Sequence, residues 1–199
     1  MEYIIKKTIL TITGPTGSGK TEFLKILCEK YPIVKMVTTT TRPPRPGEVE
    51  GVDYYFVTEG QFLAAIAANE FVEHVTYEGK YYGTSSLECQ RIIDSGKTPA
   101  VILDPKGVSA FRRYRDHTAF DVCSVYIEAD PHTLMSRYLC RLVGETITED
   151  LAKYHARRMS SLLNEYDTWK SETIYDFIEY NVGSIKDLRT RAEEIYNQI

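Results

Sequence analysis

The stretch GPTGSGKT at residues 14–21, with TILTIT before it at 8–13, decides the fold of this chain. The β-branched run before the glycines predicts a strand, and Phe23, Leu24 and Leu27 after them have helical spacing. Strand, glycine-rich loop and helix in this order fit the G-x-x-x-x-G-K-[ST] pattern of a phosphate-binding loop. In such a loop, backbone N–H groups and a helix N-terminus point at phosphate oxygens. We therefore expect a nucleoside triphosphate to bind here.

The residues of this phosphate loop have separate expected roles. Lys20 would reach the outer phosphates as a catalytic residue, and the Thr21 hydroxyl would ligate Mg²⁺, the expected cofactor. An ordinary glycine-rich turn would leave the Lys-Thr pair and its place between strand and helix unexplained. The loop residues expected to bind this nucleotide are Gly14, Pro15, Thr16, Gly17, Ser18, Gly19, Lys20 and Thr21.

Strands and helices alternate along most of the chain. Further strands are predicted at 33–38, 101–104, 121–129 and 175–181, and a helix begins after the N-cap pair Asp130-Pro131. A closing helix is predicted at 184–199. This alternation predicts an α/β fold with a P-loop NTPase-type parallel sheet flanked by helices.

Residues 39–84 interrupt this rhythm. They contain DYYFV, then a helical pattern in QFLAAIAANE, then FVEHVTYEGKYYG, whose Glu78-Gly79 pair could turn a hairpin. We interpret them as an inserted, mostly antiparallel subdomain.

The composition excludes several classes of partner. The 199 residues suit one domain, and 24 Lys plus Arg against 28 Asp plus Glu give a net charge of -4, with no footprint for nucleic acid or anionic lipid. The apolar runs at the start are too short and too broken by lysine for a signal peptide, which indicates a cytoplasmic protein with no membrane partner. No obligate protein partner is evident. The scattered cysteines suggest buried free thiols, and the scattered histidines suggest no metal ligands.

The segment TTTTRPPRPGE at 38–48 has two possible functions. Arg42 and Arg45 bracket a rigid Pro-Pro pair, and arginine forks suit the bidentate binding of phosphate. The run Pro43-Pro44-Arg45-Pro46 is also a P-x-x-P motif, which could bind an SH3-type partner.

The series GPTGSGKT, TTTTRPPRPGEVEGVDYYFV, EFVEH and KYYGTS, in this order, resembles the guanylate kinase family. The resemblance covers essentially the whole chain and is strongest through residue 84. It implies one domain over 1–199, with a core at 1–38, 85–140 and 159–199, a nucleoside-monophosphate-binding insert at 39–84 and a helical lid at 141–158. It also implies transfer of the γ-phosphoryl of ATP to GMP or dGMP.

The resemblance also implies an acceptor pocket, and the chemistry of guanine agrees with it. Guanine presents donors at N1 and N2 and an acceptor at O6, which a carboxylate such as Glu73 and a hydroxyl such as Thr84 would match. Singly, each residue could be structural, and only the joint pattern favours a site. The implied GMP-binding residues are Thr38, Arg42, Arg45, Tyr54, Glu73, Tyr82, Thr84 and Asp104.

Two later stretches resemble the lid of the family. RYLCR at 137–141 suggests Arg141, and ARRMSSLLNE at 156–165 suggests Arg158 with Glu165 seven residues on, with Arg157 as a competing candidate. The catalytic residues implied are Lys20, Arg45, Arg141 and Arg158. Asn181 matches a family position near the adenine of ATP.

One departure from the family affects the acids. The family typically has an Asp-hydrophobic-Asp pair before a glycine, whereas this chain has VILDPKG. Matching at Gly107 makes Asp104 the second acid and puts Ile102 at the first; matching ILD to ILD makes Asp104 the first. Asp104 could also hold Mg²⁺ through a water.

Two alternative functions therefore remain. The missing acid is compatible with a kinase of another or modified nucleoside monophosphate on the same fold. Domains of this kind also occur as non-catalytic peptide-binding modules, although the intact phosphate loop argues against that function. The guanine-reading motif of P-loop GTPase switches is lacking.

Overall fold

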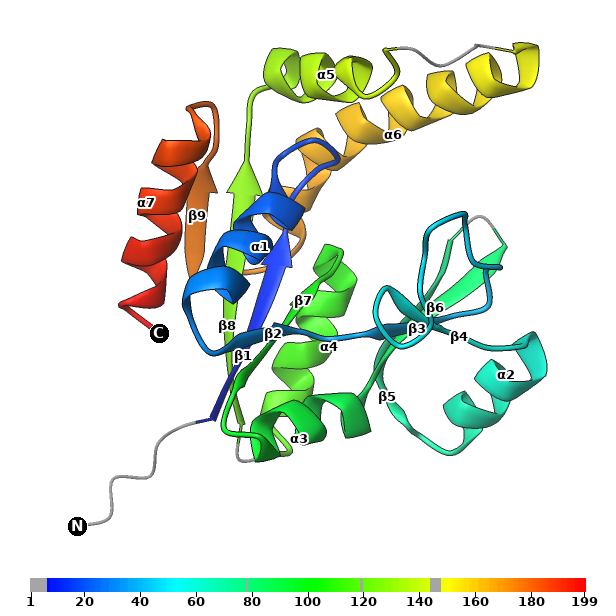
Figure 1. Cartoon of the computed structure of the whole chain (residues 1–199), viewed down its shortest axis with the longest axis vertical. Coiled ribbons are helices and arrows are strands. Elements are labelled where there is room, and N and C mark those ends of the chain that lie inside the picture. Colours follow the sequence, from blue (N-terminus) through cyan, green and yellow to red (C-terminus); the bar gives the residue numbers. More distant parts are fainter. Residues whose placement is uncertain (1–6, 78, 119, 144–147) are drawn as a thin grey trace. The chain divides into compact units, whose positions relative to one another are not determined.

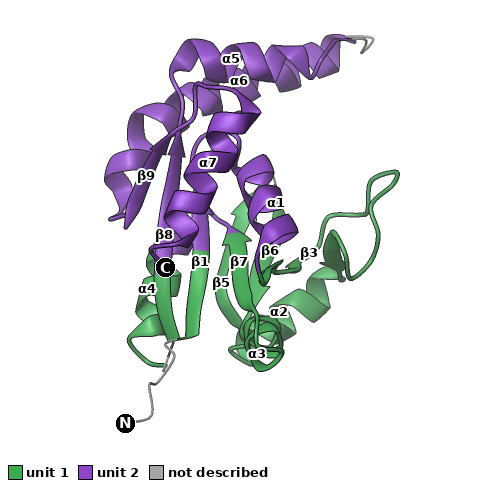
Figure 2. Cartoon of the chain, turned by 60° about the vertical axis from the view of Figure 1, so that its left-hand side comes forward, with its two compact units in different colours: residues 1–10, 32–101, 109–122 green, residues 11–31, 102–108, 123–199 purple. Residues whose placement is uncertain are grey.

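The computed structural model describes residues 7–77, 79–118, 120–143 and 148–199 (Figure 1). Its chain divides into two compact units (Figure 2). Unit 1 contains residues 1–10, 32–101 and 109–122, and unit 2 contains residues 11–31, 102–108 and 123–199. The phosphate loop therefore belongs to unit 2, and all of the predicted insert belongs to unit 1.

A five-stranded sheet has the strand order β2-β7-β1-β8-β9. Its strands are β1 (Lys7–Thr13), β2 (Ile33–Lys35), β7 (Thr98–Ile102), β8 (Phe120–Glu128) and β9 (Phe177–Tyr180). The pairs β2–β7 and β8–β9 are parallel, and β1 and β8 each begin in unit 1 and end in unit 2. The predicted α/β fold with a parallel sheet is confirmed.

Unit 1 contains a second sheet in the order β4-β3-β6-β5. Its strands are β3 (Thr38–Thr40), β4 (Tyr54–Phe56), β5 (Phe71–Tyr77) and β6 (Lys80–Ser85). Two of its pairings are antiparallel, as predicted, but β3 and β4 are parallel. Helices α2 (Glu59–Ala67) and α3 (Ser86–Asp94) also belong to this unit, and Phe62 of α2 stacks on Phe71 of the sheet at 4.5 Å between ring centroids.

Besides the phosphate loop, unit 2 contains several helices. They are α1 (Lys20–Lys30), α5 (Pro131–Cys140), α6 (Glu149–Glu172) and α7 (Ile185–Tyr196), while α4 (Pro105–Arg115) passes from unit 2 into unit 1. Asp130 caps α5 by accepting from the Thr133 backbone N–H, and Pro131 follows it, as the sequence predicted. Fully buried apolar side chains from several of these elements form its core, each contributing about 1.5–3 kcal/mol. They include Ile12, Phe23, Leu27, Val125, Ile127, Leu134 and Leu162.

The predicted strand at 33–38 is two strands. Its backbone leaves the first sheet at Met36, whose N–H donates to the Ala100 carbonyl, and enters the second sheet at Thr38. Between them the Val37 N–H donates to the buried carboxylate of Glu88 on α3. The uniform β-branched pattern of the segment hides this change of sheet.

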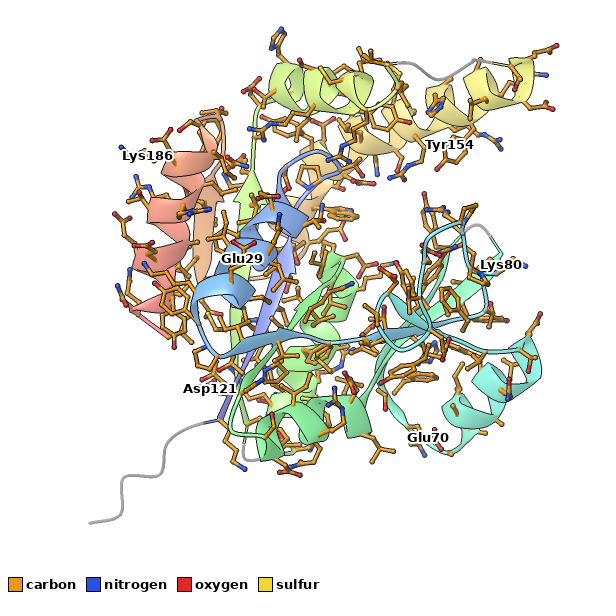
Figure 3. All side chains as sticks on the ribbon, in the orientation of Figure 1. Glu29, Glu70, Lys80, Asp121, Tyr154 and Lys186 are labelled. Atoms are coloured by element: carbon orange, nitrogen blue, oxygen red, sulfur yellow. The ribbon has the colours of Figure 1, made fainter. Side chains whose placement is uncertain are left out.

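Charged side chains of both signs are exposed on both units, among them Glu29, Glu70, Lys80 and Lys186 (Figure 3). Within the described residues none of the four cysteines forms a disulfide, but only Cys89 and Cys123 are buried, while Cys140 is exposed at the end of α5. Among the residues that the structure describes, no helix is long and apolar enough to cross a membrane.

Candidate nucleotide sites

The phosphate loop requires glycine at two positions for steric reasons. Gly14 has φ 147°, and a Cβ there would collide with the Ile127 carbonyl. Gly19 has φ 101° and precedes α1, and a Cβ there would collide with the Asn181 side chain. Because glycine has no side chain to cap α1, the first N–H groups of the helix remain available for a phosphate oxygen.

The Lys20 side chain lies folded onto the loop that it follows. Its Nζ donates to the Gly14 carbonyl at 2.6 Å and to the Pro15 carbonyl at 2.9 Å. Burial lowers the pKa of Lys20 to about 8, the nearby Glu165 carboxylate opposes this shift, and Arg141 and Arg158 add to it. A polyanion entering the loop would favour the charged amine.

A direct connection joins the loop to helix α6. The Thr16 N–H donates to Glu165 Oε2 at 2.8 Å, and Arg158 Nη2 donates to Thr16 Oγ1 at 2.9 Å. Arg158 Nη1 also lies 3.9 Å from Glu165 Oε1, and Ser161 Oγ donates to the same oxygen at 3.0 Å. Glu165 is buried at 7% exposure. The family resemblance aligned Glu165 together with Arg158 but implied no role for its carboxylate.

The three candidate lid arginines differ in their burial and in the groups that they contact. Arg158 is partly buried beside the loop, whereas Arg157 is exposed and its Nε donates to the Lys153 carbonyl of its own helix. Arg141 is exposed at the C-cap of α5, and its charge lowers the pKa of Lys20. Helix α6 continues without a break through residue 158, and residues 144–147 of the predicted lid lie outside the described residues.

Asn181 supports the loop from the end of β9. Its Nδ2 donates to the Ser18 carbonyl at 2.8 Å, and its backbone N–H donates to the Glu128 carbonyl at 2.6 Å. Arg137, which sequence reasoning did not single out, donates to the Asn181 carbonyl at 3.1 Å. A polar hollow of about 770 Å³ between β9 and α7 borders Asn181. A contact of Asn181 with adenine stays a prediction.

Thr21 and Asp104 are suitable ligands for Mg²⁺ by chemistry. Thr21 is exposed at the second position of α1. Asp104 lies two residues beyond the end of β7, and its Oδ1 accepts from the Gly107 N–H at 2.7 Å, so it caps α4. Mg²⁺ takes few protein oxygens and completes its shell with water and phosphate, so a hydroxyl and one carboxylate oxygen are compatible with it.

In unit 1, five of the predicted GMP-binding residues share one face of the second sheet. Paired residues on neighbouring strands point to the same face, and so do residues two apart on one strand. The register pairs Thr38 with Tyr54, Thr40 with Tyr82, and Glu73 with Thr84. The residues on this face therefore include Thr38, Tyr54, Glu73, Tyr82 and Thr84.

Glu73 occupies this face because of the register of the β5–β6 hairpin. The pairing is continuous from the Tyr77–Lys80 pair to the Glu73–Thr84 pair, so the Glu73 carboxylate lies opposite Thr84, and the shift in register comes only beyond Glu73, at Phe71. The Thr84 hydroxyl donates to Glu73 Oε1 at 2.5 Å, and Thr84 is fully buried. Carboxylate and hydroxyl thus form one hydrogen-bonding unit that can accept from a ligand.

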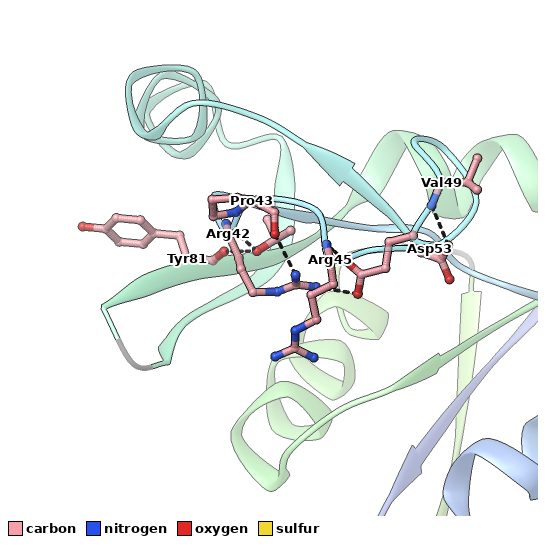
Figure 4. Close-up of polar contacts among 8 residues, drawn as sticks. Arg42, Pro43, Arg45, Val49, Asp53 and Tyr81 are labelled. Carbon is pink, nitrogen blue, oxygen red and sulfur yellow. Dashed lines mark hydrogen bonds and ion pairs between the residues drawn. The ribbon is translucent and has the colours of Figure 1, made fainter. Parts of the chain in front are cut away.

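The loop that begins at Arg42 is organised by Glu48 (Figure 4). Glu48 accepts from Arg42 Nη2 at 2.8 Å and from the Arg45 backbone N–H at 2.7 Å, and this pairing with Arg42 lowers the pKa of Glu48. The Arg42 guanidinium lies 5.3 Å from the centre of the Tyr54 ring. The Arg45 guanidinium projects away from the loop, and within the described part of the chain no carboxylate forms a salt bridge with it. Arg45 is therefore the arginine available to an anion.

Two threonines of the segment at 38–48 form hydrogen bonds with backbone groups. Thr40 Oγ1 donates to the Tyr81 carbonyl and accepts from the Arg42 N–H, and Thr41 Oγ1 accepts from the Tyr81 N–H. These bonds hold the start of the loop that begins at Arg42 against β6.

The opposite face of the second sheet is also hollowed. A pocket of about 450 Å³ is lined by Thr39, Tyr55, Phe62, Phe71, Ser85 and Glu88, among others. It lies between the sheet and helices α2 and α3, away from the face that carries Glu73 and Thr84. It is a separate feature from the candidate acceptor face.

Comparison with known proteins places these features in a family. The guanylate kinase family model matches residues 6–187. The guanylate kinase of Chlamydia felis is 45% identical over 106 residues, 52% of each chain, so this chain spans about half the length of that relative in the match. The guanylate kinase of Lactobacillus acidophilus is 32% identical over 183 residues, covering 91% of this chain and 87% of that one.

A solved structure agrees with these matches. The crystal structure of guanylate kinase from Anaplasma phagocytophilum aligns with a TM-score of 0.68 and 25% identity, covering 97% of this chain and 86% of that one. With a phosphate loop on β1 and α1 and matches over almost its whole length, this chain belongs to the guanylate kinase family.

Proposed function

We propose that the protein transfers the γ-phosphoryl group of ATP to GMP or dGMP, giving ADP and GDP or dGDP. The observation that carries this proposal is the Glu73–Thr84 pair on the second sheet. A carboxylate accepts from the N1 and N2 donors of guanine, and the Thr84 oxygen lies beside it. Adenine would place an acceptor at N1 against this carboxylate, so the pair favours guanine.

The phosphate loop supports the choice of donor. Its positive-φ glycines and the uncapped start of α1 suit the phosphates of ATP, and Lys20 would turn from the Gly14 and Pro15 carbonyls to the outer phosphates. Bound Mg²⁺, held by Thr21 and by Asp104 through a water, would neutralise charge on the donor phosphates. Arg141 and Arg158 carry further positive charge near Lys20.

The chain's own residues would act by position and charge. An oxygen of the GMP phosphate forms a bond to the γ-phosphorus while the bond from that phosphorus to the β–γ bridging oxygen breaks, and ADP leaves with the electron pair. The acceptor phosphate is largely ionised near neutral pH, so no general base is needed. Arg45 would bind the acceptor phosphate, and Lys20 and Arg158 would stabilise charge on the transferred group.

The division into core, insert at 39–84 and lid at 141–158 is part of the same proposal. The insert coincides with the part of unit 1 that carries the second sheet and α2, and the lid arginines lie in unit 2. Substrate closure of these segments would exclude water and limit hydrolysis of ATP.

Release of ADP from ATP and Mg²⁺, measured against a panel of nucleoside monophosphates, tests the proposal. GMP and dGMP are expected to give the highest kcat/KM, and AMP, CMP and UMP values lower by orders of magnitude. A preference for a modified monophosphate would favour the alternative kinase. Absence of ADP release with every monophosphate would favour the peptide-binding module.

A further inference from the structure

Three residues on one face of helix α6 position its contacts with the phosphate loop. Arg158, Leu162 and Glu165 are spaced i, i+4 and i+7, which places them on the same side of a helix. Leu162 is fully buried in a cluster with Ala129 and Leu134. The buried leucine fixes this part of α6, so the two charged side chains that flank it start from a rigid backbone.

Both charged side chains meet at Thr16, the third residue of the loop. They contact different atoms of it: Glu165 accepts from the backbone N–H at 2.8 Å, and Arg158 donates to the hydroxyl at 2.9 Å. The guanidinium and the carboxylate lie 3.9 Å apart. Thr16, Arg158 and Glu165 thus form a closed triangle of contacts. Thr16 lies 142 positions from Arg158 and 149 from Glu165 in the chain.

Such a triangle has a consequence for an arginine that acts on a phosphoryl group. A free arginine side chain populates many rotamers, and about 2 kcal/mol of rotamer entropy is lost when it is held. A charge already held in place at the moment of reaction stabilises the transition state better than one that must first be ordered. Here a hydroxyl and a carboxylate hold the guanidinium beside the loop without any ligand.

We infer that Thr16 and Glu165 are positioning residues that hold Arg158 beside the phosphate loop. This inference rests on the proposed function, in which Arg158 acts on the transferred group. Thr16 acts through its hydroxyl and Glu165 through its carboxylate. The Thr16 backbone N–H, which donates to Glu165, remains when the side chain is replaced.

A double-mutant cycle tests the hydroxyl. Thr16→Val keeps the shape and the backbone N–H but removes the acceptor for Arg158, and Thr16→Ser restores that acceptor. Thr16→Val is expected to lower kcat on the order of tenfold with a smaller change in the KM for GMP. Thr16→Ser should recover most of this loss. Arg158→Ala should lower kcat by about 100-fold or more.

The decisive variant combines both changes. If Thr16 acts only by holding Arg158, Thr16→Val should cause no further loss of kcat in the Arg158→Ala background. The same cycle on urea unfolding, measured without nucleotide, should also show coupling, because the contact exists in the free protein. Asp167→Asn, which changes an exposed acid on α6, is the matched control and should leave both measurements unchanged.

Three results would overturn the inference. Additive losses of kcat in the double variant would show that Thr16 acts apart from Arg158. Coupling in unfolding without coupling in kcat would show that the contact is structural only. A parent protein that phosphorylates no monophosphate would contradict the proposed function, and the positioning role would fall with it; this outcome is recognised before any variant is made.

Discussion

Lys20 has a partly buried amine whose charge depends on its neighbours. Its pKa of about 8 lies below the ordinary value of 10.5, chiefly because burial disfavours the charged form, while Glu165 opposes and Arg141 and Arg158 reinforce this shift. We therefore predict that kcat/KM for ATP is constant below about pH 8 and falls about tenfold per pH unit above it, because the neutral amine cannot bind phosphate. A value that stays flat to pH 9.5 would contradict this.

A second variant tests the effect of Glu165 on the pKa of Lys20. Glu165→Gln removes a carboxylate that raises the pKa of Lys20, so the alkaline fall in kcat/KM should begin at lower pH. The control Asp167→Asn should leave the profile in place. An unmoved profile in Glu165→Gln would mean that the carboxylate does not act on the amine.

Two buried serines in unit 2 differ in whether their hydroxyls are paired. Ser18 Oγ has no hydrogen-bond partner among the residues that the structure describes, whereas Ser124 Oγ donates to Asp176 Oδ2 at 2.7 Å. In nucleotide-free protein, Ser18→Ala is predicted to leave the free energy of unfolding unchanged or slightly raised. Ser124→Ala should lower it by about 1–3 kcal/mol, because the Asp176 carboxylate loses a donor. Urea unfolding measures both, and a larger loss in Ser18→Ala would refute the assignment.

At the scale of elements, the register of the β5–β6 hairpin places Glu73 opposite Thr84. A shift of one residue in this register would turn Glu73 to the other face of the sheet. Glu73→Gln puts an amide where the carboxylate accepted, so the preference for GMP over AMP should fall by about 1–3 kcal/mol. The ratio of their kcat/KM values measures it.

The exposed Glu70 just before β5 provides the control for this variant. Glu70→Gln should keep the parental ratio of kcat/KM for GMP and AMP. An unchanged ratio in Glu73→Gln as well would exclude Glu73 as a reader of guanine.

Some elements could be predicted from the sequence because local chemistry determines them. The strand, glycine loop and helix around Lys20 follow from β-branched residues, positive-φ glycines and apolar spacing. Asp130-Pro131 predicts its helix start for the same reason. The five GMP-binding candidates that share one sheet face were chosen from the family resemblance. No pattern in the sequence predicted the register that brings them together.

Other features depend on contacts distant in sequence and could not be predicted. The change of sheet at Val37 depends on Glu88, and the parallel pairing of β3 with β4 depends on the long arginine loop between them. The role of Glu48 in that loop could have been suspected from its spacing of six residues from Arg42, but only the structure shows the ion pair.

At the scale of the whole molecule, the two units carry different candidate sites. The phosphate loop lies in unit 2, and the Glu73–Thr84 pair lies in unit 1. Phosphoryl transfer requires both substrates together. An ATP analogue that cannot react and GMP should therefore protect residues 148–158 from hydrogen exchange more together than either does alone, because lid arginines need phosphates of both. Equal exchange with and without ligands would indicate a fixed helix.

The central claim concerns where the γ-phosphoryl group goes. The most direct measurement is ³¹P NMR of the protein with ATP, Mg²⁺ and GMP, which distinguishes transfer from hydrolysis in one spectrum. We predict that the GMP signal is lost in step with the γ-phosphate signal of ATP, that nucleoside diphosphate signals replace them, and that no inorganic phosphate accumulates. Inorganic phosphate in place of GDP, or unchanged ATP and GMP, would contradict the account.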